Sequence, residues 1–64
     1  MADVHVINHG SVFMFQPVSA AAKEWVDEHV QLEGWQWMGP AFAVDPRYVD
    51  GLVEGMAGDG LEVA

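Results

Sequence analysis

The stretch SVFMFQPVSAAAKEWVDEHV, residues 11–30, changes from strand-like to helix-like sequence and therefore decides the fold. Its first six residues are rich in β-branched and aromatic side chains, which favour a strand. Pro17 ends that strand, and Ser19 is a good N-terminal cap for the strong helix formers that follow. Apolar residues at three- and four-residue spacing form the expected buried stripe of this helix: Ala22, Trp25, Val26 and His29 or Val30.

The residues before this stretch alternate in polarity, as a half-buried strand does. In DVHVIN (3–8) the two valines share one face, and His5 and Ile7 share the other. Residues 8–10, Asn-His-Gly, then supply turn chemistry. We therefore expect a hairpin, whose register stays open because the turn is longer than a two-residue loop.

The residues after the helix contain two short apolar runs, WQWM (35–38) and AFAV (41–44). Gly39-Pro40 between them is either a tight turn between two strands or a bulge in one bent strand. The second option needs an edge position, because proline cannot donate to a sheet hydrogen bond. In a strand, both tryptophans of the first run point the same way, and we expect them to point inward.

Asp45 and Pro46 mark the start of a second helix, as cap and first helical residue. Five residues form its expected apolar face: Tyr48, Val49, Leu52, Val53 and Met56. Gly51 and Gly55 lie off that face, so we expect no packing reason for either glycine. LEV (61–63) could add a short last strand. The order predicts one α+β domain over residues 1–64, an antiparallel sheet of three or four strands with two helices on one face (β-β-α-β-α).

The chain carries ten acidic and two basic residues, Lys23 and Arg47, for a formal net charge of −8. Such a charge repels nucleic acid and anionic lipid and attracts basic surfaces at long range. No basic segment followed by an apolar one begins the chain, and no apolar run reaches the roughly 18 residues of a membrane span. We therefore expect a soluble intracellular protein, a monomer or weak dimer, that contacts neither nucleic acid nor a membrane directly.

Residues that could support catalysis or bind a metal do not form a recognisable motif. His5 and His9 would lie roughly 13 Å apart in an extended strand, too far to share a metal ion. Ser19 is explained as a helix cap, and neither a nucleophile elbow nor a phosphate-binding glycine loop is present. We expect no catalytic residue, no cofactor and no metal site, and a chain of 64 residues has little volume for an enclosed pocket.

The acidic residues of the two helices are placed where they repel one another. Glu24, Asp27 and Glu28 occupy about 6 Å of helix rise, a local charge density that approaches that of a DNA duplex. Each like-charge pair costs about 0.2–0.5 kcal/mol, and Asp50 and Glu54 repeat the arrangement in the second helix. We therefore predict an acidic, DNA-mimicking surface that binds a basic protein. Its residues are Glu24, Asp27, Glu28, Asp50 and Glu54, with Glu33 and Asp45 flanking.

Two other interpretations remain open at this point. One is an antitoxin-like or adaptor module that binds its partner through an apolar patch around Trp35, Trp37 or Phe42. The other is a protein whose acidity confers only solubility. Strong salt dependence of binding favours the acidic surface, whereas sensitivity to aromatic truncation favours the apolar patch.

The sequence resembles a group of small uncharacterised bacterial proteins over nearly its whole length. The shared pattern is NHGS-V-F-M-F, KEWVDEH, W-Q-W-M-G-x-A-F-A-V and D-P-R-Y-V-x-x-L-V-x-G-M followed by D-G-L, and its most specific part is DPRYVDGLVEGMAGDGL (45–61). In its short length and acidity the chain is also similar to phage-encoded anti-CRISPR proteins, in particular a small type I-C inhibitor.

The second resemblance implies a partner and a place of action. The partner is the crRNA-guided type I-C surveillance complex (Cascade), contacted through a Cas subunit in the cytoplasm of the bacterial host. The implied mechanism is occlusion of the basic surface that receives target DNA near the PAM. The resemblance implies no catalytic residue, and the acidic residues named above come from the physical argument.

Overall fold

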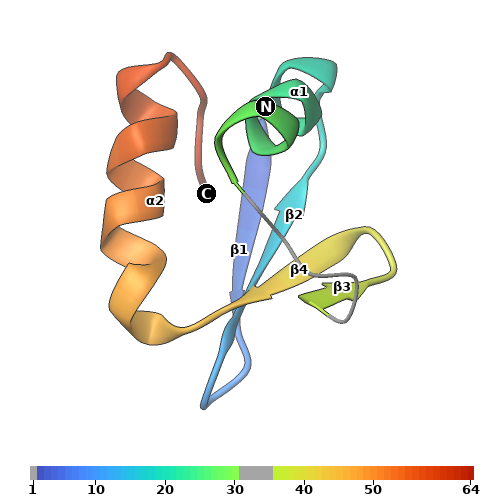
Figure 1. Ribbon diagram of the computed structural model, residues 1–64, viewed down its shortest axis with the longest axis vertical. Coiled ribbons are helices and arrows are strands. Elements are labelled where there is room, and N and C mark those ends of the chain that lie inside the picture. Colours follow the sequence, from blue (N-terminus) through green and yellow to red (C-terminus); the bar gives the residue numbers. More distant parts are fainter. Residues whose placement is uncertain (1, 31–35) are drawn as a thin grey trace.

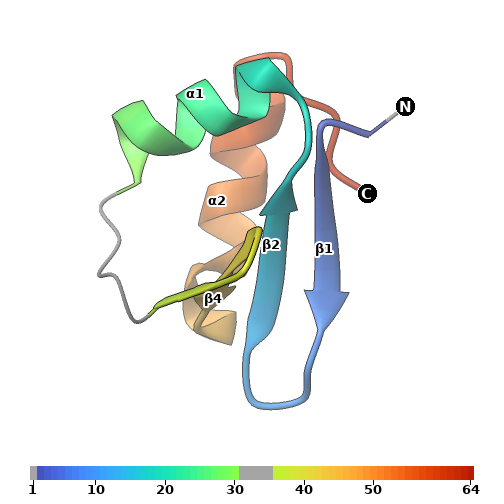
Figure 2. The same cartoon turned by 90° about the vertical axis from the view of Figure 1, so that its right-hand side faces the viewer.

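The structure, a computed structural model, describes residues 2–30 and 36–64 and confirms an α+β fold (Figure 1). The elements follow the order β1 (Val4–Asn8), β2 (Phe13–Pro17), α1 (Ala20–His29), β3 (Trp37–Met38), β4 (Ala41–Val44) and α2 (Pro46–Gly58). The strands form one antiparallel sheet in the order β1-β2-β4-β3, and both helices lie on the same face of it (Figure 2). Among the described residues, no helix covers the other face.

Turn chemistry fixes the two hairpins. Asn8 Oδ1 accepts a hydrogen bond of 2.8 Å from the Gly10 amide, and Gly10 adopts a φ of 85°, a conformation that favours glycine. The resulting register, which the sequence left open, pairs Val6 with Phe15. Gly39 has a φ of 64° in the connection between β3 and β4, so the two apolar runs are separate strands joined by a tight turn.

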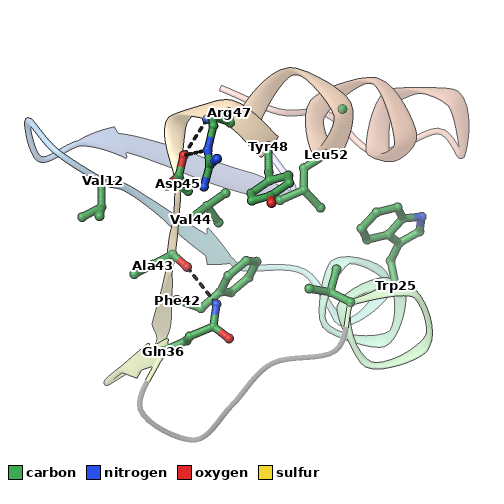
Figure 3. Close-up of a pocket in the computed structure, with 12 residues that line it drawn as sticks. Val12, Trp25, Gln36, Phe42, Ala43, Val44, Asp45, Arg47, Tyr48 and Leu52 are labelled. Atoms are coloured by element: carbon green, nitrogen blue, oxygen red, sulfur yellow. Dashed lines mark hydrogen bonds and ion pairs between the residues drawn. The ribbon is translucent and has the colours of Figure 1, made fainter.

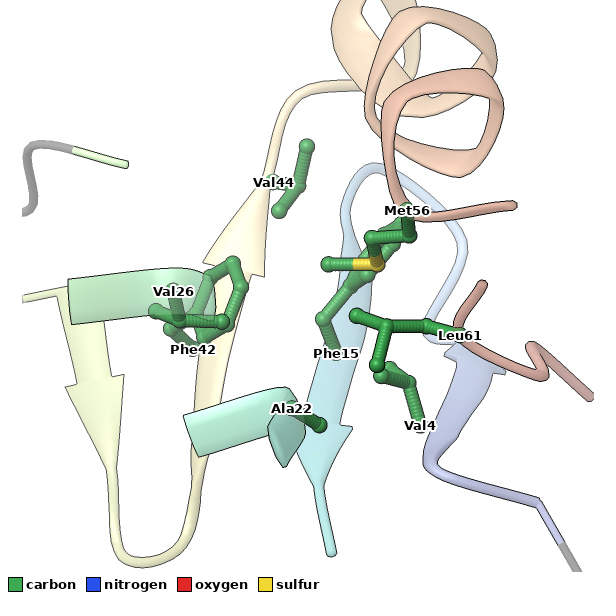
Figure 4. Close-up of a cluster of buried hydrophobic side chains, with 8 residues drawn as sticks. All are labelled: Val4, Phe15, Ala22, Val26, Phe42, Val44, Met56 and Leu61. Atoms are coloured by element: carbon green, nitrogen blue, oxygen red, sulfur yellow. The ribbon is translucent and has the colours of Figure 1, made fainter. Parts of the chain in front are cut away.

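The pairing of β2 with β4 joins two halves of the chain that share one order of elements. Residues 4–29 and 37–58 each form a hairpin followed by a helix, and the second strand of each half lies at the centre of the sheet. Phe15 pairs with Phe42 there, both side chains are fully buried, and their rings stack with centroids 5.7 Å apart. The core around this pair is shown in Figure 4: Val4, Phe15, Ala22, Val26, Phe42, Val44, Met56 and Leu61.

Helix α1 begins at its predicted cap and buries part of its predicted stripe. The Ala22 amide donates a 3.1 Å hydrogen bond to Ser19 Oγ, which satisfies one of the free amides of the first turn. Ala22 and Val26 are buried, as predicted. Trp25 and Val30 are only half-buried and pack against the edge of the core.

Helix α2 also begins at its predicted cap, Asp45, but one residue of its predicted apolar face is exposed. Met56 is fully buried, and Val49 packs against the core. Tyr48 is 61% exposed, so its predicted place on the buried face is wrong. The eight residues between Tyr48 and Met56 rotate the helix by about 800°, which leaves the tyrosine about 80° away from the core direction.

Helix α1 contacts α2 through Trp25. A Cβ atom on Gly55 would lie 3.3 Å from Trp25 Cζ2, and the indole Nε1 donates a 2.6 Å hydrogen bond to Asp59 Oδ2. The expectation that Gly55 has no packing role is therefore wrong, because its lack of a side chain lets the indole lie against α2. The helical pattern could not show this contact, since the indole comes from another element.

The C-terminal residues run beside β1. Val63 forms a single parallel bridge with Val4, so the short strand expected at 61–63 is reduced to one bridge. The Glu62 amide donates a 2.8 Å hydrogen bond to Asp3 Oδ2. This hydrogen bond lowers the pKa of the Asp3 carboxyl, because it stabilises the charged form.

Substitution of the two interior glycines of α2 tests the Trp25 contact. A methyl group on residue 51 would meet no atom within 4 Å, so we expect Gly51→Ala to raise the free energy of unfolding by about 0.5–1 kcal/mol through helix propensity alone. We expect a smaller gain for Gly55→Ala and a loss for Gly55→Val, because the added methyl groups must displace the indole. Thermal unfolding followed by circular dichroism measures the stability of all three variants. Equal gains in stability for Gly51→Ala and Gly55→Ala would contradict the contact between Trp25 and Gly55.

Candidate functional site

Helix α1 presents three carboxylates on the side away from the core. At about 100° per residue from the buried Val26, Glu24 and Glu28 lie roughly 160° and 200° around the helix, and Asp27 lies at about 100°. All three are exposed, and none forms a hydrogen bond or ion pair with another described residue. Lys23, the nearest cation in sequence, has no carboxylate partner within the described part of the chain. We call Glu24, Asp27 and Glu28 the α1 acidic group.

Helix α2 carries a smaller set, Asp50 and Glu54, which we call the α2 acidic pair. Both are exposed, and neither has a hydrogen-bonding or ionic partner among residues 2–30 and 36–64. Arg47 does not neutralise them, because its Nε donates to Asp45 Oδ1 at 3.1 Å and its Nη2 donates to Asp45 Oδ2 at 3.4 Å. The pair therefore remains an exposed negative site.

The two residues predicted to flank the surface are Asp45 and Glu33. Asp45 Oδ1 accepts a 2.9 Å hydrogen bond from the Arg47 amide, and the Arg47 guanidinium engages both carboxylate oxygens. These hydrogen bonds lower the pKa of the Asp45 carboxyl, and the one from the Arg47 amide has the largest effect. Asp45 thus caps α2 and its carboxylate is already engaged, while Glu33 lies outside the described residues.

The acidic residues lie at different angles around the contact between the helices. Relative to Trp25, Asp27 lies about 160° around α1, Glu24 about 100° and Glu28 about 60°. Relative to Gly55, Asp50 lies about 140° around α2 and Glu54 about 100°. Because Trp25 packs on Gly55, Asp27 and Asp50 face away from the neighbouring helix, whereas Glu28 lies nearest to it.

Sequence reasoning missed the role of Asp59 at the contact between the helices. The Trp25 indole stacks on the His29 imidazole with centroids 4.6 Å apart and donates to the Asp59 carboxylate. His29 Nε2 lies 3.9 Å from the same carboxylate oxygen. Asp59 therefore links the C-terminal ends of both helices, and its partner lies 34 residues away in sequence, which no local pattern signals.

An apolar cleft of about 740 Å³ lies between the two helices and β4 (Figure 3). Its walls include Trp25 of α1, Phe42 of β4 and Leu52 of α2, and the paired Asp45 and Arg47 lie at one end. The cleft is open to solvent, so it does not contradict the expectation that so short a chain has little volume for an enclosed pocket. No Ser, Cys, His or Lys occurs among the described lining residues, most of which are apolar.

The two described aromatic residues of the alternative surface, Trp37 and Phe42, pack in or against the core. Phe42 is fully buried, and Trp37 packs edge-on against it with ring centroids 5.2 Å apart. This contact confirms that Trp37 points inward, although its place on the edge strand β3 leaves it 39% exposed. Trp35 lies outside the described residues. Of the three, Trp37 is the described residue that offers an exposed ring.

Within residues 2–30 and 36–64, no three His, Cys, Asp or Glu side chains could hold a metal ion together. Neither described helix has the length and apolar character needed to span a bilayer. Comparisons of the chain with protein-family models, with curated proteins and with solved structures found no match. A functional assignment therefore rests on the geometry and charge of the chain itself.

We expect the fold to lose stability in acid as its two engaged aspartates are protonated. Hydrogen bonds from the amides of Glu62 and Arg47 lower the pKa of Asp3 and Asp45, respectively. A carboxylate with a lowered pKa stabilises the fold above the unfolded pKa of about 3.9, and this contribution disappears as the pH falls through the folded pKa. Melting temperatures measured from neutral pH into acid should therefore decline below about pH 4.

The variant Asp45→Asn should show a smaller acid decline than the parent, because the titrating cap is gone. The matched control is Asp50→Asn, which removes an unpaired carboxylate from the same helix. If Asp45→Asn and Asp50→Asn followed the same pH profile, the cap would not be the source of the acid sensitivity.

Proposed function

We propose that the protein is a non-catalytic inhibitor that binds a basic protein surface through the α1 acidic group. One observation carries the proposal: three exposed carboxylates, without partners among the described residues, fall within about 6 Å of helix rise. Their spacing approaches the one charge per about 1.7 Å of a DNA duplex. A groove that receives DNA phosphates would therefore meet a similar row of negative charge on α1.

The partner that we propose is the type I-C CRISPR surveillance complex in the bacterial cytoplasm, contacted at a basic Cas subunit. Effector complexes of this kind hold nucleic acid in a positively charged channel. A chain with a net charge of −8 is attracted to such a channel at long range, so association should be fast and sensitive to salt. Occupation of the channel by α1 would block the binding of target DNA. We choose this partner because the chain resembles type I-C anti-CRISPR proteins in its short length and acidity.

The energetic cost of the α1 acidic group favours binding over solubility as its role. An even spread of the charge over the molecular surface of 4232 Å² would avoid like-charge pairs within one helix. The pairs Glu24–Asp27 and Glu24–Glu28 each cost about 0.2–0.5 kcal/mol, and no described cation offsets them. The α2 acidic pair lies on the other helix and contributes long-range attraction only.

The proposal is tested with two variants that remove equal charge from different helices. E24Q/E28Q and D50N/E54Q each neutralise two carboxylates at four-residue spacing, which changes the net charge from −8 to −6. We expect E24Q/E28Q to weaken inhibition by about tenfold, since each lost contact contributes up to about 1 kcal/mol. We expect D50N/E54Q to change inhibition by less than about threefold. The measurement is displacement of labelled target duplex from the purified surveillance complex, at low and high salt.

Both variants should remain folded and melt at or above the parent temperature, because each loses a repulsive pair. Equal losses of inhibition in the two variants would mean that inhibition depends on the net charge and not on the helix that carries the carboxylates. Unchanged inhibition by both variants, with a loss for Trp37→Ser, would favour the aromatic patch instead. If the parent protein does not displace the duplex at either salt concentration, the proposed partner is wrong.

A further inference from the structure

The sheet face opposite the helices differs from the rest of the surface in its charge. No Asp, Glu, Lys or Arg stands at an outward position of the described strands. The residues at these positions are the polar His5 and Gln16 and the apolar Ile7, Met14, Met38, Ala41 and Ala43. Met14 and Ala41 are only 6% and 8% exposed. Ile7 is 43% exposed and Met38 is 65% exposed. The nearest carboxylates, those of Asp3 and Glu62, lie at the β1 edge of this face.

We infer that a second copy of this chain docks on the open face, sheet against sheet, in a weak homodimer. Two copies that each carry −8 repel one another. The other carboxylates of residues 2–30 and 36–64 lie on the helices and at their ends, so the open face is where two copies can approach with the least repulsion. Depletion of charge and enrichment of methionine are also typical of the centres of protein interfaces.

The order of the strands lets two copies contact each other in a symmetric way. Ile7 on β1 and Met38 on β3 lie at opposite edges of the sheet, with alanines between them on the central β4. A two-fold axis parallel to the strands would place β1 of one copy over β3 of the other. Met38 of each copy would then lie over β1 of its partner at the level of His5, two residues along the strand from Ile7, which gives two equivalent contacts.

Docking through a sheet edge is less favourable than docking through the face. The backbone of β1 is already bonded to the C-terminal residues, with Val6 N to Ala64 O at 2.8 Å and Ala64 N to Val4 O at 3.0 Å. The other edge strand, β3, has two residues, too few for an extended ladder. The open face is therefore the surface of the sheet that remains available.

The size of the face sets the strength of the dimer. Strands about 4.8 Å apart with a rise of about 3.3 Å per residue give a four-stranded face on the order of 300 Å². A standard stable interface buries about 800 Å² on each partner. We therefore expect a weak dimer that buries less area than a standard stable interface. Salt should tighten the dimer by screening the repulsion, which is the opposite of its effect on the proposed basic partner.

Sedimentation equilibrium of the protein from about 10 μM to about 1 mM, at low and high salt, tests the inference. Met38→Lys reduces the net charge from −8 to −7, so a loss of self-association cannot come from added overall repulsion. Tyr48→Lys, at an exposed aromatic residue on α2, makes the same charge change away from the face. We expect dimerisation to weaken at least about tenfold in Met38→Lys and to persist in Tyr48→Lys.

Ile7→Lys, at the other edge of the face, should reproduce the effect of Met38→Lys, and circular dichroism should show that each variant is folded. A parent protein that stays monomeric at about 1 mM in high salt would overturn the inference. Equal weakening by Met38→Lys and Tyr48→Lys would also overturn it, because the open face would then have no special role.

Discussion

The pairing of β2 with β4 is the contact on which the rest of the structure depends. It places Phe15 beside Phe42 at the centre of the sheet, with both rings fully buried. Aromatic side chains of this kind bury about 150–250 Å² each, which is a large share of the core available to so short a chain. Because the pairing joins two strand-strand-helix halves, it also brings α1 and α2 onto one face, where Trp25 meets Gly55.

This arrangement gives the two sides of the molecule different chemistry. The contact between Trp25 and α2 fixes the rotation of α1, so the α1 acidic group faces solvent without partners among the described residues. Strand alternation turns uncharged residues such as Met38 to the opposite side. One side is therefore suited to a basic partner and the other to an uncharged apolar one. The two proposed associations can be separated because salt should weaken the first and strengthen the second.

Features that depend on neighbouring residues could be predicted from the sequence. Ser19 and Asp45 cap the helices as expected, because a capping side chain bonds an amide two or three residues away. The exposure of the α1 acidic group followed in the same way from the 3.6-residue period of a helix. The α+β class followed from the order of the elements.

Features that depend on how the two helices meet could not be predicted. The role of Gly55 and the hydrogen bond between Trp25 and Asp59 join residues from different elements. The apolar cleft of about 740 Å³ has the same origin, because helical periodicity carries no information about the relative orientation of two helices. Hydrogen exchange of the protein, free and bound to the type I-C surveillance complex, tests the central claim that α1 is the contact helix. We predict that amides of residues 20–29 gain protection on binding while those of residues 37–44 exchange as in the free protein. Gained protection in residues 37–44, with none in residues 20–29, would contradict it.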